Sequence, residues 1–291
     1  MNPNLKKNGL ILERLTEKDI PALIRLTKSV GWDYDREELS TIFSTGKVYG
    51  HRSQLGELVS AAAIILYDND SLASIGMVLV SQEYRGAGLG KEVTKICMDS
   101  VPSETPIMLV ASNAGEPVYK KMGFKTISHV YKVSCDCYIP SNKIQEILVE
   151  ITPFSETDFS EVVKLDEKAT GVNRQEFLFH RIKQAKKSIV VKDECGVIIG
   201  FGLSIQATKN LLLGPLVTPN DEIAALLMNK LVNNYMGKLR IDLASEHENF
   251  MELLEKQGFD DVTKRPMMVI NPDKFPQRNG TLYGIAGQTF G

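Results

Sequence analysis

A glycine-rich segment between an apolar run and a helix constrains this sequence most. The apolar run over 75–80 is of strand type, and three glycines follow it within five residues, at Gly86, Gly88 and Gly90. A helix follows, because apolar residues recur at helical spacing at Val93, Ile96 and Cys97. Residues without a Cβ let backbone N–H groups converge on one point, and a helix N-terminus adds free N–H groups and partial positive charge. The segment therefore predicts a phosphate or pyrophosphate site, to which Arg85 adds a charge-assisted contact.

Two well-known phosphate-binding loops do not fit this segment. The dinucleotide fingerprint Gly-x-Gly-x-x-Gly has a different spacing, and the P-loop needs Ser or Thr after Gly-Lys, where this chain has Glu92. The pattern that remains is Arg-x-x-Gly-x-Gly, at Arg85, Gly88 and Gly90. It resembles the acyl-coenzyme A pyrophosphate loop of the GCN5-related N-acetyltransferases, the GNAT family.

A second segment carries the same resemblance. Residues 106–110 predict another buried strand, and Asn113, a helix with Tyr119, and Gly123-Phe124 follow it. By themselves, the last two residues are a C-capping glycine and a core aromatic. The segment is also similar to the closing part of a GNAT domain, whose tyrosine often protonates the departing coenzyme A thiolate. The resemblance implies Tyr119 as general acid and Asn113 as a contact to the pantetheine arm.

The resemblance implies acetyl-CoA as co-substrate and no metal. It assigns the cofactor's pyrophosphate to the loop residues Arg85, Gly86, Ala87, Gly88, Leu89, Gly90 and Lys91. In the family, the strand before the loop splays from its neighbour, and its free backbone groups pair with the pantetheine. Here those groups belong either to Met77 and Leu79 or to Val78 and Val80, and the sequence leaves both registers open.

The second half of the chain is a weakened copy of the first. The segment 150–159 echoes 13–20, and Gly258-Phe259 closes it as Gly123-Phe124 closes the first half. Leu254 then stands where the first half has Tyr119. After the strand over 211–217, the carboxylates of Asp221 and Glu222 are expected to cap a helix over 223–231, where they would repel a pyrophosphate.

We therefore expect a mixed α/β fold made of two GNAT-like modules in tandem, each with a central, mostly antiparallel β-sheet flanked by helices. The expected N-terminal domain covers 1–134 and binds acetyl-CoA. A linker covers 135–149, where Pro140-Ser141-Asn142 has turn chemistry, and a degenerate domain covers 150–291. The segment 280–285 is a candidate additional strand.

The acceptor side is less specified by the sequence. In GNAT proteins the connection between the first two helices commonly forms a wall of the acceptor pocket, which implies Trp32 and Tyr34 as substrate contacts. The alternatives are that Trp32 is a packing anchor and that Asp35 is a helix cap; a substrate contact is preferred for Trp32 and the cap for Asp35. Three residues are candidates for the general base: Glu57, Asp33 and His51. Glu57 is preferred because it opens a strand next to the splayed one.

Composition limits the other function classes. The chain has 291 residues, 43% of them hydrophobic and 24% charged, and a net charge of −2, which gives no support to nucleic-acid binding. The N-terminus shows no secretion signal and no apolar run is long enough for a membrane span. The four cysteines lack the spacing of a zinc site and are expected to be reduced thiols, as in a cytoplasmic protein. The expected oligomeric state is a monomer or a homodimer.

Two functions stay open at this point. The first is an N-acetyltransferase that transfers an acetyl group from acetyl-CoA to a primary amine by direct attack on the thioester. The acceptor is either a small-molecule amine, which is preferred, or a peptide or protein amine. The second is a non-catalytic acyl-CoA sensor on the same fold. Tyr119 favours the enzyme, because a sensor does not need an acid beside the thiolate.

Overall fold

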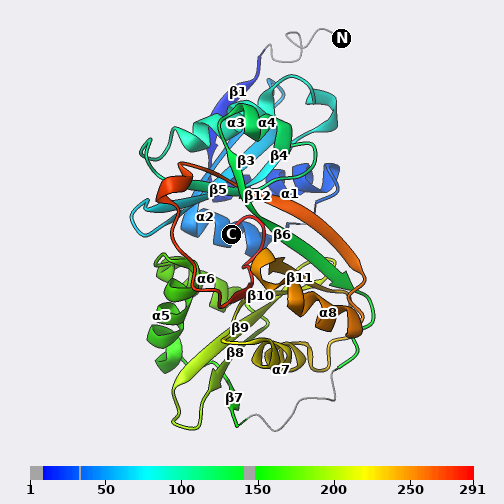
Figure 1. Ribbon diagram of the computed structural model, residues 1–291. Helices are drawn as coiled ribbons and strands as arrows, with labels where there is room; N and C mark the ends of the chain where they lie inside the picture. Colours follow the sequence, from blue (N-terminus) through cyan, green and yellow to red (C-terminus); the bar gives the residue numbers. More distant parts are fainter. Residues whose placement is uncertain (1–8, 33, 141–147) are drawn as a thin grey trace.

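The computed structural model describes residues 9–32, 34–140 and 148–291, and its N-terminal half follows the expected order of elements (Figure 1). Two helix starts carry side-chain caps, and the one at Asp35 is among the alternatives that the sequence leaves open. The Thr16 N–H donates to the Asp19 carboxylate (2.9 Å), and the Glu38 N–H donates to that of Asp35 (2.8 Å). The strands are β1 Ile11–Leu15, β2 Gly46–Arg52, β3 Leu58–Tyr67, β4 Leu72–Val80, β5 Ile107–Val110 and β6 Lys125–Cys135; the α-helices are α1 Ile20–Ser29, α2 Arg36–Thr45, α3 Leu89–Met98 and α4 Glu116–Lys121.

The C-terminal half repeats this order. Its strands are β7 Glu150–Pro153, β8 Lys187–Lys192, β9 Ile198–Gln206, β10 Leu211–Val217, β11 Leu239–Ala244, β12 Asp261–Ile270 and β13 Leu282–Gly284; its α-helices are α5 Phe159–Thr170, α6 Gln175–Gln184, α7 Asp221–Val232 and α8 Glu248–Lys256. The strand expected within 280–285 is thus present as β13. Short 3₁₀ turns complete the structure: η1 Glu17–Asp19, η2 Gln82–Tyr84, η3 Glu156–Asp158, η4 Ser245–His247 and η5 Pro272–Lys274.

The two halves share one continuous sheet and exchange a strand. The 13 described strands run in the order β1-β2-β3-β4-β5-β12-β6-β11-β13-β10-β9-β8-β7. β12 of the second half pairs with β5, and β6 of the first half pairs with β11, while β6 and β12 pair with each other. In Figure 1 these two long strands cross the middle of the molecule diagonally. The boundary predicted within 135–149 lies partly on residues outside the described ranges and stays a prediction.

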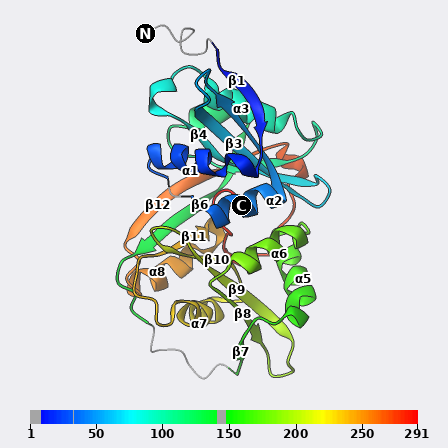
Figure 2. The same cartoon turned by 180° about the vertical axis from the view of Figure 1, so that it is seen from behind.

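Helices cover both faces of this sheet. On one face, α1 and α2 of the first half and α5 and α6 of the second enclose a single core, so the two modules meet there (Figure 2). On the other face, α3 and α4 pack over the first module and α7 and α8 over the second. A fully buried Leu or Phe side chain contributes about 1.5–3 kcal/mol, so the shared core ties the modules together.

The last residues of the chain enter this shared core. Ala286, Phe290 and Gly291 are buried, and the C-terminus lies at the centre of the molecule in Figure 1. The Tyr67 hydroxyl donates to the Phe290 carbonyl (2.6 Å), and the Arg174 guanidinium donates to that of Gly291 (3.0 Å). We call residues 285–291 the tail; it runs from β13 in the second module to β4 in the first.

Candidate active site

The glycine loop has the geometry of an anion site. Gly86 and Gly88 have φ of +81° and +84°, in the left-handed region that favours glycine. Ala87 and Leu89 are buried and anchor the loop, whereas Arg85 and Lys91 are exposed on its outer side. α3 begins at Leu89, and its first N–H groups have no partner within the helix. Donors and positive charge therefore face the same solvent-open space.

A bulge in β4 opens the sheet beside this loop. Met77 has φ +53°, and the register with β3 slips there, from Gly76 opposite Ala63 to Leu79 opposite Ala61. The parallel pairing of β4 with β5 stops at Ser74 and Met108, so the two strands diverge toward the loop. The splay expected from the family resemblance is present, and we call it the β4–β5 gap.

The ladder with β3 also shows which β4 backbone groups face the gap. The Ser81 N–H donates to the Val59 carbonyl (2.8 Å). Antiparallel pairs alternate, so Leu79 also directs its backbone groups toward β3, and Val78 and Val80 direct theirs toward the gap. Of the two registers that the sequence leaves open, this geometry favours the second.

Tyr119 lies on α4, on the face of the sheet covered by α3. Its side chain is 8% exposed, packs edge-to-face on Phe124 with ring centroids 5.9 Å apart, and reaches Thr94 of α3 with its hydroxyl. Burial raises the pKa of Tyr119 to about 12, so the phenol keeps its proton at neutral pH. At the end of β5, the exposed Asn113 accepts a hydrogen bond from Arg265 of β12 (2.5 Å).

The residues predicted for the acceptor side meet the tail. Trp32 is 39% exposed and stacks on Tyr34, with ring centroids 6.4 Å apart. The Tyr34 hydroxyl shares a hydrogen bond with that of Thr289 (2.8 Å), and burial raises the pKa of Tyr34 to about 12. A Cβ on Gly76 would come within 2.5 Å of the Thr289 Cα, so the tail crosses β4 directly before the bulge. Asp33 lies outside the described residues.

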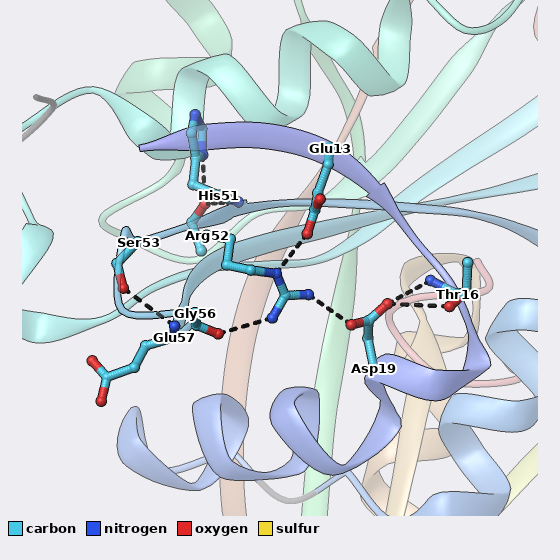
Figure 3. Close-up of polar contacts among 9 residues, drawn as sticks. Glu13, Thr16, Asp19, His51, Arg52, Ser53, Gly56 and Glu57 are labelled. Atoms are coloured by element: carbon cyan, nitrogen blue, oxygen red, sulfur yellow. Dashed lines mark hydrogen bonds and ion pairs between the residues drawn. The ribbon is translucent and has the colours of Figure 1, made fainter. Parts of the chain in front are cut away.

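The candidate bases Glu57 and His51 are not at the bulge. Glu57 is exposed in the β2–β3 turn, and Figure 3 shows its carboxylate directed away from Arg52, which pairs with Glu13 and Asp19 (both 2.6 Å). Glu57 is four residues from Ala61, which is about 13 Å along a strand. His51 is buried between the Ser60 hydroxyl (2.7 Å) and the Glu92 carboxylate (3.1 Å). Glu57 therefore stays a prediction without support from its surroundings.

In the second module the chain itself fills the corresponding gap. β10 shows the same kind of register slip, between Leu213 and Leu216, but β13 lies between β10 and β11. Gly284 is opposite Leu216 on one side and Leu243 on the other. The place that pantetheine would take in the first module is occupied here by β13.

The start of α7 also differs from the expectation. The helix begins at Asp221, and Asn220 caps it by accepting from the Ile223 N–H (3.0 Å). The expected capping by acidic side chains is wrong: Asp221 instead accepts a hydrogen bond from the Tyr283 hydroxyl of β13 (2.6 Å). The carboxylate remains at the helix N-terminus, but its partner is the strand that closes the gap.

Comparisons with known proteins agree with this architecture. Residues 34–140 and 162–284 each match a family model described as an acetyltransferase (GNAT) domain. Over 281 residues, 96% of this chain and 98% of the relative, the sequence is 33% identical to the uncharacterized N-acetyltransferase YitH of Bacillus subtilis. The chain belongs to the GNAT acetyltransferase family.

Solved structures share the fold over nearly the whole chain. A protein from Pyrococcus horikoshii, described as a putative acetyltransferase, superposes with a TM-score of 0.77 at 21% identity, covering 98% of this chain and 96% of that one. A tandem GNAT protein from the clavulanic acid biosynthesis pathway gives 0.66 at 13% identity, with 90% and 98% covered. The tandem arrangement expected from the sequence is thus confirmed.

Among residues 9–32, 34–140 and 148–291, no helix is both long and apolar enough to cross a bilayer. Over the same ranges, His, Cys, Asp and Glu side chains do not gather in groups of three that would hold a metal ion. The four cysteines are free thiols; Cys97 and Cys135 are buried, and Cys137 and Cys195 are exposed.

Proposed function

We propose that this GNAT protein is an acetyl-CoA-dependent N-acetyltransferase whose single active site lies in the first module. The observation that carries the proposal is the β4–β5 gap. It opens at the Met77 bulge, next to a glycine loop that leads into α3, whose first N–H groups have no partner within the helix. An open backbone gap must satisfy its N–H and C=O groups with a partner, and the two amides of a pantetheine arm supply one.

The residues present fit such a cofactor. The exposed Arg85 and the first turn of α3 suit a pyrophosphate, since oriented N–H groups and the helix dipole both favour negative charge. Val78 and Val80 offer backbone groups toward the gap. Asn113 keeps its amide donors for the arm, because only its carbonyl oxygen accepts from Arg265. Together they run from the loop to the bulge along one edge of β4.

Transfer needs one bond made, one bond broken and two protons moved. The acceptor amine attacks the thioester carbonyl, the carbon–sulfur bond breaks, and the amine loses a proton to solvent. The Tyr119 hydroxyl gives its proton to the leaving sulfur, and the phenolate regains a proton from solvent before the next turnover. Its environment suits this role, because a buried phenol whose pKa is raised to about 12 is protonated at neutral pH. A positioned general acid contributes about 10²–10⁴-fold in rate.

The acceptor is a primary amine, and the closed acceptor side favours a small molecule over a protein. The tail and Tyr34 occupy the face of β4 opposite Tyr119, and the second module covers that face through α5 and α6. A folded protein surface cannot approach a strand covered in this way. Trp32, which is partly exposed beside Tyr34, lies at the edge of this region.

The experiment is a screen of amines that follows free coenzyme A thiol release from acetyl-CoA. We expect amine-dependent release with at least one small primary amine, and no acceleration by the corresponding N-acetylated amine. If the protein binds acetyl-CoA but no amine in the panel accelerates thiol release, the sensor becomes the better description of this fold.

A further inference from the structure

Arg278, between η5 and β13, carries a guanidinium that the protein leaves largely unpaired. Its Nε is enclosed and lacks a hydrogen-bond partner among the residues that the structure describes. The contact recorded for Nη2 is the Met267 sulfur at 4.0 Å, a weak acceptor. The Phe275 ring is centred 5.8 Å from the guanidinium carbon, a cation–π contact that provides no oxygen acceptor for the N–H groups.

This environment is costly for a cation. Desolvation lowers the pKa of Arg278, although a guanidinium stays charged in proteins, so the protein bears the cost of burying the charge. Glu246 and, more weakly, Asp166 favour the charge through space. No hydrogen bond or ion pair joins either carboxylate to Arg278 among the described residues, and both Asp166 oxygens already bind Arg174 (2.7 and 2.8 Å). Buried charges in stable folds are usually hydrogen-bonded as well as balanced, so an enclosed guanidinium Nε without an acceptor is a candidate contact for an anion.

The position of Arg278 connects it with the acceptor side of the active site. Met267 lies opposite Val110 of β5, two residues beyond the last pairing of β5 with β4, so it is level with the β4–β5 gap. The Met267 side chain belongs to the core covered by α1 and α2, which is the face crossed by the tail and by Tyr34. Arg278 as a whole is partly exposed, so a small solute can reach it.

We propose that Arg278 binds the carboxylate of the acceptor, and that the acceptor is therefore an amine carrying a carboxylate, of the amino-acid type. A carboxylate accepts two parallel hydrogen bonds from a guanidinium, which fixes orientation as well as charge. Bound in this way, the acceptor's amine extends from β12 toward the β4–β5 gap. The inference rests on the proposed acetyl transfer and names its substrate class.

The test compares amino acids with the amines that they give on decarboxylation: L-lysine with cadaverine, and L-phenylalanine with phenethylamine. Each probe is added to the full-length protein saturated with coenzyme A, and the melting temperature is recorded; the same pairs are assayed for thiol release with acetyl-CoA. We expect a carboxylate-dependent thermal shift and a lower KM for at least one amino acid than for its partner. In Arg278→Met the ratio of the KM of the decarboxylated amine to the KM of the amino acid should fall by about 10-fold to 100-fold, the value of a charge-assisted pair.

Two controls separate recognition from folding. Arg14→Met removes an exposed arginine of β1 and should leave the preference unchanged. Arg278→Met without any ligand should melt at the same temperature as the wild type or a few degrees higher, because it removes a buried unpaired charge. A melting temperature lowered by more than a few degrees would overturn the inference by making Arg278 a structural residue. Amino acids that bind no better than their decarboxylated partners would also overturn it, and acetyl transfer to the amines alone would leave the proposed activity intact.

Discussion

The β4–β5 gap of the first module and the β10–β11 gap of the second are copies of one feature with opposite outcomes. Both open at an irregularity in the strand that precedes a helix, at Met77 in one and between Leu213 and Leu216 in the other. The first gap faces a glycine loop with free N–H groups. The second holds β13, and the helix beside it begins with Asp221, which β13 itself engages.

The difference shows how one copy of a duplicated binding site can be filled by a strand of the same chain and become part of the interface between the modules. Backbone groups in a gap between strands need partners, and a ligand or a further strand can supply them. In the second module β13 supplies these partners as part of the chain. The tail follows β13, and its residue Thr289 lies beside Gly76 of β4. The strand that fills the gap of the second module is thus followed directly by the tail, which lies on the proposed acceptor side of the first module.

The largest expected effect is on turnover, and it distinguishes a tyrosine of the first module, Tyr119, from one of the second, Tyr283. Tyr119→Phe keeps the ring packed on Phe124 and removes only the hydroxyl, so steady-state turnover should fall by about 10²–10⁴-fold while acetyl-CoA affinity stays within about twofold. Tyr283→Phe is the matched control, since it removes a hydroxyl from the filled gap. It should lower the melting temperature and leave turnover unchanged. Equal turnover in Tyr119→Phe and wild type would refute the assigned role of Tyr119.

A smaller effect is expected from the charges beside the two helices. Arg85→Ala removes an exposed guanidinium from the glycine loop and should weaken coenzyme A binding by about 10-fold or more, since a charge-assisted hydrogen bond is worth about 1.5–3 kcal/mol. Asp221→Asn at the start of α7 should not change it. Binding is measured by calorimetry, with acetyl-pantetheine as the probe that lacks the pyrophosphate. If Arg85→Ala weakened acetyl-pantetheine binding equally, the loop would act through folding and not through the anion.

The smallest effect concerns pH and the filled gap. His247 stacks on Tyr283 with ring centroids 3.7 Å apart, and desolvation lowers its pKa in the folded protein. The unfolded chain therefore binds this proton more readily, and stability is lost as the pH falls below the unfolded pKa of about 6.5. On acidification to about pH 5.5, the wild type should lose a few degrees more in melting temperature than His247→Phe, which keeps the stack. Parallel pH profiles for the two proteins would show that His247 does not titrate in this range.

The sequence specifies the local elements of this fold well and its long-range pairing poorly. The strand over 72–80, the caps at Asp19 and Asp35 and the strand within 280–285 follow from apolar periodicity and short-range hydrogen bonding, which depend on neighbouring residues. The exchange of β6 and β12 depends on which of several equally apolar strands becomes the neighbour of β5, and periodicity does not contain that choice.

The candidate site shows the same division. The glycine loop and the tyrosine helix lie in contiguous motifs, so a short pattern indicates them. Arg278 contacts Met267 and Thr289 lies against Gly76 only because the end of the second module folds back onto the first. The nearest signal in the sequence is that both residues fall outside the duplicated pattern, in a segment with no counterpart in the first half. Strand order alone favours Glu57 as base, but strand order does not give the distance along a strand that separates Glu57 from the bulge.

The central claim is that one module binds the cofactor and the other has closed its gap with its own chain. Calorimetric titration of the full-length protein with acetyl-CoA tests it most directly. The open β4–β5 gap and the β13-filled gap predict one site per chain, and Arg85→Ala should weaken that single site. A stoichiometry near two, or a single site that Arg85→Ala leaves unchanged while Asp221→Asn alters it, would contradict the account.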